Sequence, residues 1–482
     1  MRSTRKPILA GWLAAVLVTM IAGKVGAQDP KAAAAAYIDA NLERFETAAL
    51  QIWELAEVGY QEVESVAILK NELEGSGFRI EAGVAGMPTA FVAEWGQGGP
   101  VLAILAEYDA LPGITQTASP ERTPDDSKSA GHACGHHLFG VGSVAAAIAI
   151  KEWLANSGTA GTIRLYGTPA EEGGSGKVYL ARSDAFADVD AVLHWHADDE
   201  NDASPATSLA NVSVKFRFNG VSAHAAAFPE RGRSALDGVE AMNFMVNLMR
   251  EHIPEESRIH YVITRGGNAP NVVPDFAEVY YYARHPDAAV VQDLFARMVA
   301  ASEGAAQGTG TRVEHEIIGG VYSLLPNEAL ARVMDANLRK VGGVKYDANE
   351  TAFAEEIRKS FPADIPPLGS QETVMPFEQR QNGGSTDVGD VSWRVPTAGL
   401  RAATWVPGTA SHSWQAVAAG GTRIGVKGMA VAAKTLAMTA IDLYRQPEVL
   451  SEARAEFERR LPANFTYKPL VGERKPPLDY RK

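Results

Sequence analysis

Short apolar segments that end in acidic residues or histidines recur along the first half of the chain, and they set the expected fold class. The segments are Val101 to Glu107, Thr162 to Gly167 and Ala191 to Trp195. The polar residues that follow them are Asp109, Glu171, Glu172 and His196. Bounded apolar runs predict buried strands, and open α/β sheets place chemistry at the carboxyl ends of their strands. We therefore predict an α/β fold with a site along one edge of its sheet.

Helical periodicity surrounds these strands. Apolar residues at three- and four-residue spacing predict helices at 30–57, 61–77, 141–155, 328–341, 352–359 and 424–443. A chain of 482 residues exceeds one ordinary hydrophobic core, so we expect two domains.

Residues 209–320 differ in pattern from the rest of the chain. Four apolar residues, Val212, Val214, Phe216 and Phe218, alternate with polar ones, which predicts a strand with one exposed face. Predicted elements then follow in the order β-α-β-β-α-β, the split ferredoxin-like unit. We interpret 209–320 as an inserted domain between residues 28–208 and 321–446. The charged, Pro-containing tail at 447–482 is expected to be a surface appendage.

The N-terminus has the three parts of a secretory signal peptide. Arg2, Arg5 and Lys6 precede an apolar run, Ile8 to Gly23, and a small-residue sequence that ends at Ala27. This build predicts cleavage after Ala27 and export, with the periplasm as the expected compartment. A retained membrane anchor is the alternative, but the run is short for a span. We expect no later segment to cross a membrane.

The charge of the chain excludes some partners. The formal net charge is −13, and removal of residues 1–27, with four basic and no acidic residues, changes it to −17. An acidic chain without a basic stretch argues against nucleic acid and anionic membranes as partners. Cys134 is the only cysteine, so no internal disulfide can form.

The sequence Gly131 to His137 reads GHACGHH and concentrates soft metal ligands. Thiolate and neutral imidazole both bind zinc-like ions well. A lone histidine is more often a surface or core residue, but here Cys134 and His136 are accompanied by acids and histidines at strand ends and loops. The candidate ligands are Cys134, His136, Glu172, His196 and His412. They favour a zinc, manganese or cobalt site, with His132 and His137 as alternative ligands.

Glu171 and Glu172 are adjacent, and adjacent side chains in extended structure point to opposite sides. One carboxylate can therefore bind metal while the other takes a proton from the attacking water, as metal-assisted hydrolysis requires. A solvated acidic turn is an equal alternative.

Three residues of the insert are weaker candidates on sequence alone. His224 ends its first strand among small residues, and Asn271 and Arg284 could hold a carboxylate. A strand-end histidine, a surface loop and a solvated arginine explain them as well.

Other catalytic motifs fail on inspection. Gly173 to Lys177 lacks the leading glycine and following Ser/Thr of a phosphate loop, and Gly383 to Asp387 lacks the last glycine of a serine-hydrolase elbow. Cys134 as a thiol nucleophile with His136 is the best rival mechanism. It leaves the remaining candidate ligands unexplained.

Eight motifs together resemble the aminoacylase/carboxypeptidase-type dinuclear metallohydrolases. They are AEYDALP (106–112), GHACGHH (131–137), TPAEEGG (168–174), LHWH (193–196), SAHAA (222–226), NVVPD (271–275), STDVGDVSW (385–393) and SHSW (411–414). Within that family the chain is most similar to the branch of the aminobenzoyl-glutamate hydrolase B subunit, beside the auxin-conjugate and N-acyl amino acid amidohydrolases. The resemblance covers about residues 35 to 445.

The resemblance implies a mixed-sheet catalytic domain with two divalent metal ions and an inserted dimerisation or lid domain. It assigns the five candidate ligands to the metals, Glu171 as general base, and Asp109 as the acid that orients a ligand. His224 matches a histidine that reaches the partner subunit's site, and Asn271 and Arg284 match contacts to the substrate carboxylate. His137 and Glu107 stand where many relatives have other residues.

These expectations define a metal-dependent amidohydrolase that cleaves N-acyl or N-aroyl amino acids, expected as a homodimer with a possible second type of subunit. The alternatives are a dipeptidase or aminopeptidase of the same family, or a binding homologue that has lost turnover.

Overall fold

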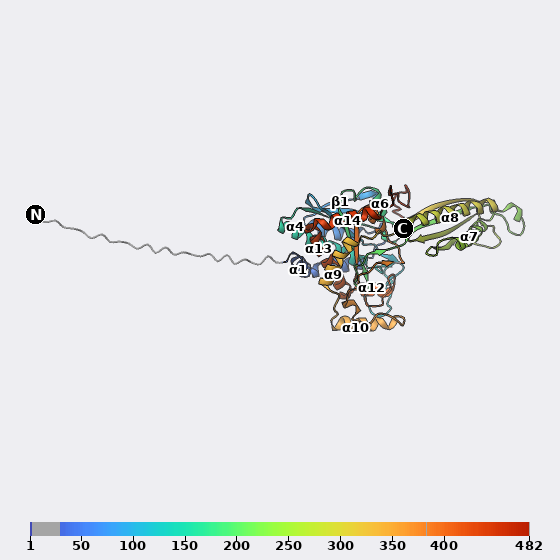
Figure 1. The fold of residues 1–482 in the computed structure, drawn as a ribbon. Helices are drawn as coiled ribbons and strands as arrows, with labels where there is room; N and C mark the ends of the chain where they lie inside the picture. Colours follow the sequence, from blue (N-terminus) through green and yellow to red (C-terminus); the bar gives the residue numbers. More distant parts are fainter. Residues whose placement is uncertain (2–28, 382, 482) are drawn as a thin grey trace.

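The structure, a computed structural model, describes residue 1 and residues 29–381 and 383–481. The predicted signal peptide, apart from Met1, lies outside the described residues. The described chain forms a large body and an insert that extends to one side of it (Figure 1).

The body is built on a six-stranded sheet. Its strands are β1 (Arg79–Ala82), β2 (Phe91–Gln97), β3 (Val101–Ala106), β6 (Gly161–Gly167), β7 (Ala191–Asp198) and β14 (Thr397–Ala403). Their order is β1-β2-β6-β3-β7-β14, in which β6, β3, β7 and β14 pair in parallel and β2 pairs antiparallel with both of its neighbours, β1 and β6. The predicted mixed α/β sheet is therefore confirmed. Because four neighbouring strands are parallel, their carboxyl ends meet at one edge.

Two long helices pack against this sheet and form the centre of the core. Helix α4 (His136–Ser157) contacts β3, β6 and β7, and α13 (Arg423–Arg445) contacts α4, β7 and β14. Both are long and apolar enough to span a membrane, contrary to our expectation that no such segment follows residue 27. Most of each helix is buried inside the protein, which is typical of core helices of soluble proteins.

Further helices cover the body. They are α1 (Pro30–Ala40), α2 (Leu42–Leu55), α3 (Val63–Gly75), α6 (Gly176–Arg182), α9 (Glu328–Val341), α10 (Ala348–Ile357), α11 (Val388–Ser392), α12 (Trp414–Gly420) and α14 (Pro447–Arg460). The single helix predicted over 30–57 is wrong, because the chain breaks at Asn41 between α1 and α2. The short pairs β4–β5 (Leu111–Pro112, Ala130–Gly131) and β8–β13 (Ala206–Thr207, Arg380–Gln381) lie outside the main sheet.

The insert has the predicted element order. Its strands are β9 (Ala210–Asn219), β10 (Arg258–Arg265), β11 (Phe276–His285) and β12 (Arg312–Val321), with helix α7 (Ala235–Met249) between β9 and β10 and helix α8 (Ala288–Thr309) between β11 and β12. The antiparallel sheet has the order β10-β11-β9-β12, so β10 is an edge strand. Most buried apolar side chains of the insert form a cluster of their own, separate from the main core of the body. This is the split ferredoxin-like unit expected from the sequence.

The C-terminal tail is not the surface appendage we expected. Helix α14 packs on α9 and α13, and Leu478 and Tyr480 pack against the core of the body. Phe465, Tyr467 and Leu470 pack against the apolar cluster of the insert. The tail therefore contacts both parts of the molecule.

Candidate active site

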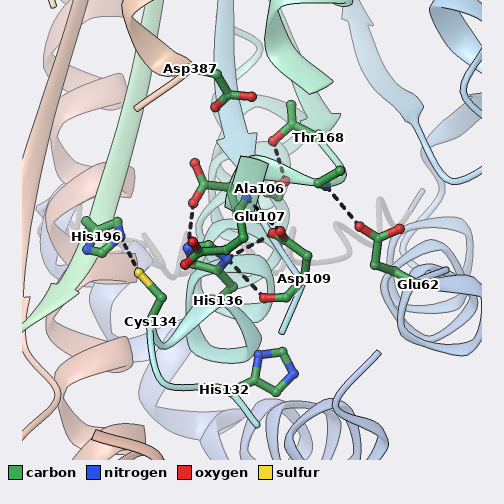
Figure 2. A network of polar contacts seen from close by, with 12 residues as sticks. Glu62, Ala106, Glu107, Asp109, His132, Cys134, His136, Thr168, His196 and Asp387 are labelled. Atoms are coloured by element: carbon green, nitrogen blue, oxygen red, sulfur yellow. Dashed lines mark hydrogen bonds and ion pairs between the residues drawn. The ribbon is translucent and has the colours of Figure 1, made fainter. Parts of the chain in front are cut away.

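The loops at the carboxyl edge of the sheet bring together residues from four distant segments. Glu107 and Asp109 follow β3, Glu171 and Glu172 lie in the short helix α5 (Glu171–Gly174) after β6, and His196 lies within β7. They line or adjoin a cavity of about 650 Å³. The close-up in Figure 2 shows Cys134, His136 and His196 turned toward one another there, with Glu107 and Asp109 beside them.

Two overlapping groups in this cluster have the composition and spacing of metal-ligand sets. The first is Cys134, His136 and His196, and the second is Cys134, Glu172 and His412. Within each group the potential ligand atoms lie within 4.8 Å of one another. The structure thus brings all five sequence-predicted ligands together, with the sulfur of Cys134 common to both groups. A third group, Glu107, His136 and Glu171, adjoins them.

Unpaired polar atoms in the cluster fit a bound cation. His136 Nε2 lies 3.1 Å from Glu107 Oε2, and His412 Nε2 lies 3.2 Å from Glu172 Oε1. Despite these distances, His136 Nε2, Glu107 Oε2 and Glu172 Oε1 are buried without a hydrogen-bond partner among the described residues. A buried polar atom without a partner lowers the stability of the folded protein. A cation bound between these nitrogen and oxygen atoms would accept the lone pairs of all of them. The donor set of thiolate, imidazole and carboxylate suits zinc, manganese or cobalt.

Asp109 fixes two of these residues at once. Its Oδ1 lies 2.9 Å from His136 Nδ1, and its Oδ2 accepts a hydrogen bond of 2.9 Å from the backbone N–H of Glu172. Burial alone would raise the pKa of Asp109, but His136 and this backbone bond lower it, so the carboxylate stays ionised. An ionised acceptor makes Nδ1 the protonated nitrogen of His136 and leaves Nε2 free for a metal.

Glu171 lines the same cavity beside Glu172. Burial raises the pKa of Glu171 well above its usual range, and the carboxylates of Glu107 and Glu172 raise it further. A carboxyl group with a raised pKa in a cavity has the properties of a general acid–base residue.

A buried lysine balances part of the acidic charge. Lys177 Nζ lies 2.7 Å from Glu107 Oε1 and 2.6 Å from Asp387 Oδ1, and all three side chains are fully buried. Burial alone would lower the pKa of Lys177, but Asp387 and Glu107 raise it, so its ammonium remains charged. The network joins α6 to the end of β3. Sequence reasoning missed it, because Lys177 appeared there only as part of a rejected phosphate loop.

His132 and His137 lie outside the ligand groups. His132 Nε2 lies 3.1 Å from the carbonyl oxygen of Ile52, and His137 Nε2 lies 3.0 Å from that of Gly420. Burial lowers the pKa of His137 to about 3 and that of His132 well below its usual value, so both are neutral. Figure 2 shows His132 pointing away from Cys134.

The three candidates of the insert are placed differently. Arg284 lines the cavity, where its Nη1 donates to Ser385 Oγ over 3.2 Å and its Nε has no partner in the described part of the chain. His224 and Asn271 are exposed, and they do not line the cavity of their own chain. A single chain therefore brings Arg284, but not His224 or Asn271, to the ligand cluster.

Comparison with known proteins places this geometry in a family. Residues 103–412 match the profile of Peptidase family M20/M25/M40. The chain is also 39% identical over 472 residues to the B subunit of p-aminobenzoyl-glutamate hydrolase of Escherichia coli, covering 90% of this chain and 98% of that protein. The chain belongs to the M20/M25/M40 family. The predicted family resemblance and the prediction of a hydrolase are thereby confirmed.

Other known proteins are also similar to the chain. An Xaa-Arg dipeptidase of Mus musculus is 31% identical over 448 residues, covering 89% of this chain and 93% of that protein. The crystal structure of a dinuclear metal-binding M20 peptidase from Bacillus subtilis matches with a TM-score of 0.58 at 19% identity, over 84% of this chain and 99% of that chain. This structural likeness shows that the two chains share a fold.

Proposed function

We propose that the chain is a metal-dependent amidohydrolase that cleaves the amide bond of N-aroyl or N-acyl amino acids of the aminobenzoyl-glutamate type. The observation that carries the proposal is the position of Glu171 in a cavity beside two overlapping ligand groups that share Cys134. The identity of 39% to the B subunit of p-aminobenzoyl-glutamate hydrolase, over nearly its whole length, supports the substrate class.

Two divalent ions, when bound, would polarise the amide carbonyl and lower the pKa of the attacking water. Glu171 accepts the proton of that water and delivers it to the amine nitrogen as the carbon–nitrogen bond breaks. The products are a carboxylic acid and a free amino acid. We propose that Arg284, whose Nε has no partner among the described residues, binds the carboxylate of the amino acid, and that Asn271 of a second copy assists it.

A dipeptidase is the second candidate, because the Xaa-Arg dipeptidase relative is 31% identical over most of both chains. The two functions share the metal site and differ in the acyl group of the substrate and in the amino acid that is released.

The test is a substrate panel with protein loaded separately with Zn²⁺, Mn²⁺ or Co²⁺. We expect kcat/KM for aminobenzoyl-glutamate to exceed that for Xaa-Arg dipeptides by about tenfold or more, since a pocket that binds an aroyl group discriminates by about 1–3 kcal/mol. Faster cleavage of dipeptides would favour the dipeptidase. Protein that binds two metals per chain but cleaves no compound of the panel would favour a binding homologue.

We further propose that the insert forms a homodimer. Exposed apolar side chains gather on α7 (Phe244, Met245 and Leu248) and on the edge strand β10 (Tyr261, Val262 and Ile263). An exposed apolar helix face beside an unpaired strand edge favours association with another chain. Since the E. coli relative is the B subunit of its hydrolase, a different kind of subunit is the alternative occupant.

His224 gives this dimer a functional test. It is exposed on the insert, and we propose that it supports the developing oxyanion in the site of a second copy. Mixing inactive His224→Ala chains with inactive Glu171→Gln chains should then restore activity. Random exchange makes about half of the dimers mixed, each with one complete site, so about a quarter of wild-type kcat is expected.

The control for this mixture pairs His224→Ala with a chain that carries both substitutions, which should restore nothing. No recovery from the first mixture, with subunit exchange verified by native mass spectrometry, would show that His224 does not act across the dimer.

Export remains a proposal based on residues 1–27. Expression of the full chain with a C-terminal tag, followed by fractionation and N-terminal sequencing, should locate the protein in the periplasm with cleavage after Ala27.

A further inference from the structure

We propose that Tyr480 and Arg481, at the far end of the tail, are positioning residues for the turn that carries Glu171 and Glu172. The inference rests on the proposed function, in which Glu172 binds metal and Glu171 moves the proton. It concerns how the chain holds these two carboxylates in place.

The turn, residues 170–175, has a backbone conformation that depends on contacts with other segments. Ala170 and Ser175, at its two ends, have φ angles of 57°, and Gly173 has a φ of 91°. Residues other than glycine rarely adopt positive φ, and such a conformation persists only when surrounding contacts fix it.

Both backbone polar groups of Glu172, the N–H and the carbonyl oxygen, are hydrogen-bonded. Its N–H donates to Asp109 Oδ2, as described above. Its carbonyl oxygen accepts two hydrogen bonds from the tail, one from the Tyr480 hydroxyl over 3.0 Å and one from Arg481 Nη2 over 2.8 Å. Asp109, which also orients His136, therefore fixes the N–H of Glu172, and the tail fixes its carbonyl oxygen.

A second layer of contacts fixes Tyr480 itself. Its ring packs edge-to-face on Tyr60 with 5.7 Å between centroids, and the Tyr60 hydroxyl donates to the Gly174 carbonyl over 2.8 Å. Glu62 accepts a hydrogen bond of 2.9 Å from the backbone N–H of Ala170. A Cβ on Gly59 would overlap with the Tyr480 hydroxyl, so glycine there permits the close approach. The loop between α2 and α3 and the tail thus enclose the turn.

The tail is anchored before it reaches the turn. Arg182 Nη1 donates to the carbonyl oxygens of Gly472 and Arg474, each over 2.8 Å, and Gln61 Nε2 donates to that of Leu478 over 3.0 Å. Arg474 in turn donates through Nη1 to the carbonyl oxygens of Ile317 and Ile318 in β12. These bonds fix the path of the tail between the body and the insert, so the positions of Tyr480 and Arg481 are set by many contacts.

The test uses the full chain with Tyr480→Phe and Arg481→Ala combined. This variant keeps the packed ring of residue 480 but loses both donors to the Glu172 carbonyl. Loss of groups that orient metal ligands costs about 10- to 100-fold in metal affinity or activity. We expect the affinity of metal-free protein for Zn²⁺, measured against a chromophoric chelator, to fall by about that factor. We expect kcat of the Zn²⁺-loaded protein to fall while KM changes little.

Two matched variants separate positioning from general stability. Glu473→Ala removes an exposed tail side chain that makes no hydrogen bond or ion pair with any described residue, and it should leave Zn²⁺ affinity and kcat unchanged. Tyr480→Phe combined with Arg481→Lys, which retains a charged donor at position 481, should recover part of what the double variant loses. Thermal unfolding of the metal-free variants should remain close to that of the wild type.

An unchanged Zn²⁺ affinity and an unchanged kcat in the double variant would overturn the inference. So would equal losses in Glu473→Ala, because they would reflect the tail in general. Failure of the wild-type chain to bind Zn²⁺ in the same titration would overturn the proposed function, and the inference with it.

Discussion

Glu171→Gln protein is expected to bind as much metal as the wild type and to lose kcat by about 10²- to 10⁴-fold, the range for loss of a general acid–base residue. Glutamine keeps the size and polarity of the side chain but cannot accept and return a proton. Metal content by elemental analysis and kcat on aminobenzoyl-glutamate measure the two effects separately.

The raised pKa of Glu171 predicts how the Glu171→Gln substitution affects the stability of the folded protein. Burial and the neighbouring carboxylates of Glu107 and Glu172 disfavour its ionised form in the folded protein. A carboxyl whose folded pKa lies above its unfolded pKa costs stability as the pH rises through the unfolded value. Metal-free Glu171→Gln protein should therefore unfold at neutral pH no more easily than the wild type, so lost activity would not reflect unfolding.

Glu200→Gln is the matched comparison, since Glu200 lines the same cavity and belongs to none of the ligand groups found in the described residues. It should retain most of kcat. Normal turnover by the Glu171→Gln enzyme would show that another group is the base.

Cys134→Ser protein is expected to lose most of its metal, because Cys134 is common to both ligand groups. A serine hydroxyl stays protonated at neutral pH and is a much weaker ligand than a thiolate. Elemental analysis after dialysis should show fewer than two ions per chain, and competition with a chelator should show an affinity lower by about 100-fold or more.

The same variant tests the thiol-nucleophile mechanism. Burial raises the pKa of the Cys134 thiol in the metal-free protein, whereas nucleophilic cysteines have lowered values. If Cys134→Ser protein kept both ions yet lost all activity, the thiol mechanism would be favoured instead. His137→Gln, which can still donate to the Gly420 carbonyl, should keep its metal and serves as the control.

The ligand cluster was predictable because most of its residues can be recognised from their immediate neighbours in the sequence. Cys134 and His136 lie in the Cys/His sequence, Glu172 and His196 follow apolar strands, and parallel strands end at a common edge. His412, in a loop, was the one candidate ligand outside both patterns. The insert was predictable for the same reason, since alternating and helical periodicities can be read within short windows. Boundaries were less accurate: α4 begins at His136 rather than near Val141, and β7 continues through His196 to Asp198.

The remainder of the site depends on contacts between residues far apart in the chain. Lys177 meets Asp387 across 210 residues, and Tyr480 meets Glu172 across 308. No periodicity records such a pairing, and a charged segment with prolines is typical of an exposed tail. His224 and Asn271 are exposed and do not line the cavity of their own chain, so the roles proposed for them require a second copy.

The insertion of a complete domain between β7 and β14 has a consequence for the order of folding. The insert is one contiguous segment with its own apolar cluster, whereas β7 must pair with a strand about 200 residues later. Because distant pairings carry a larger loop-closure cost, we expect the insert to fold first and the body to close when β14 arrives. His412 lies beyond β14, so a complete ligand set exists only after this closure. Metal uptake would then report the final step of folding.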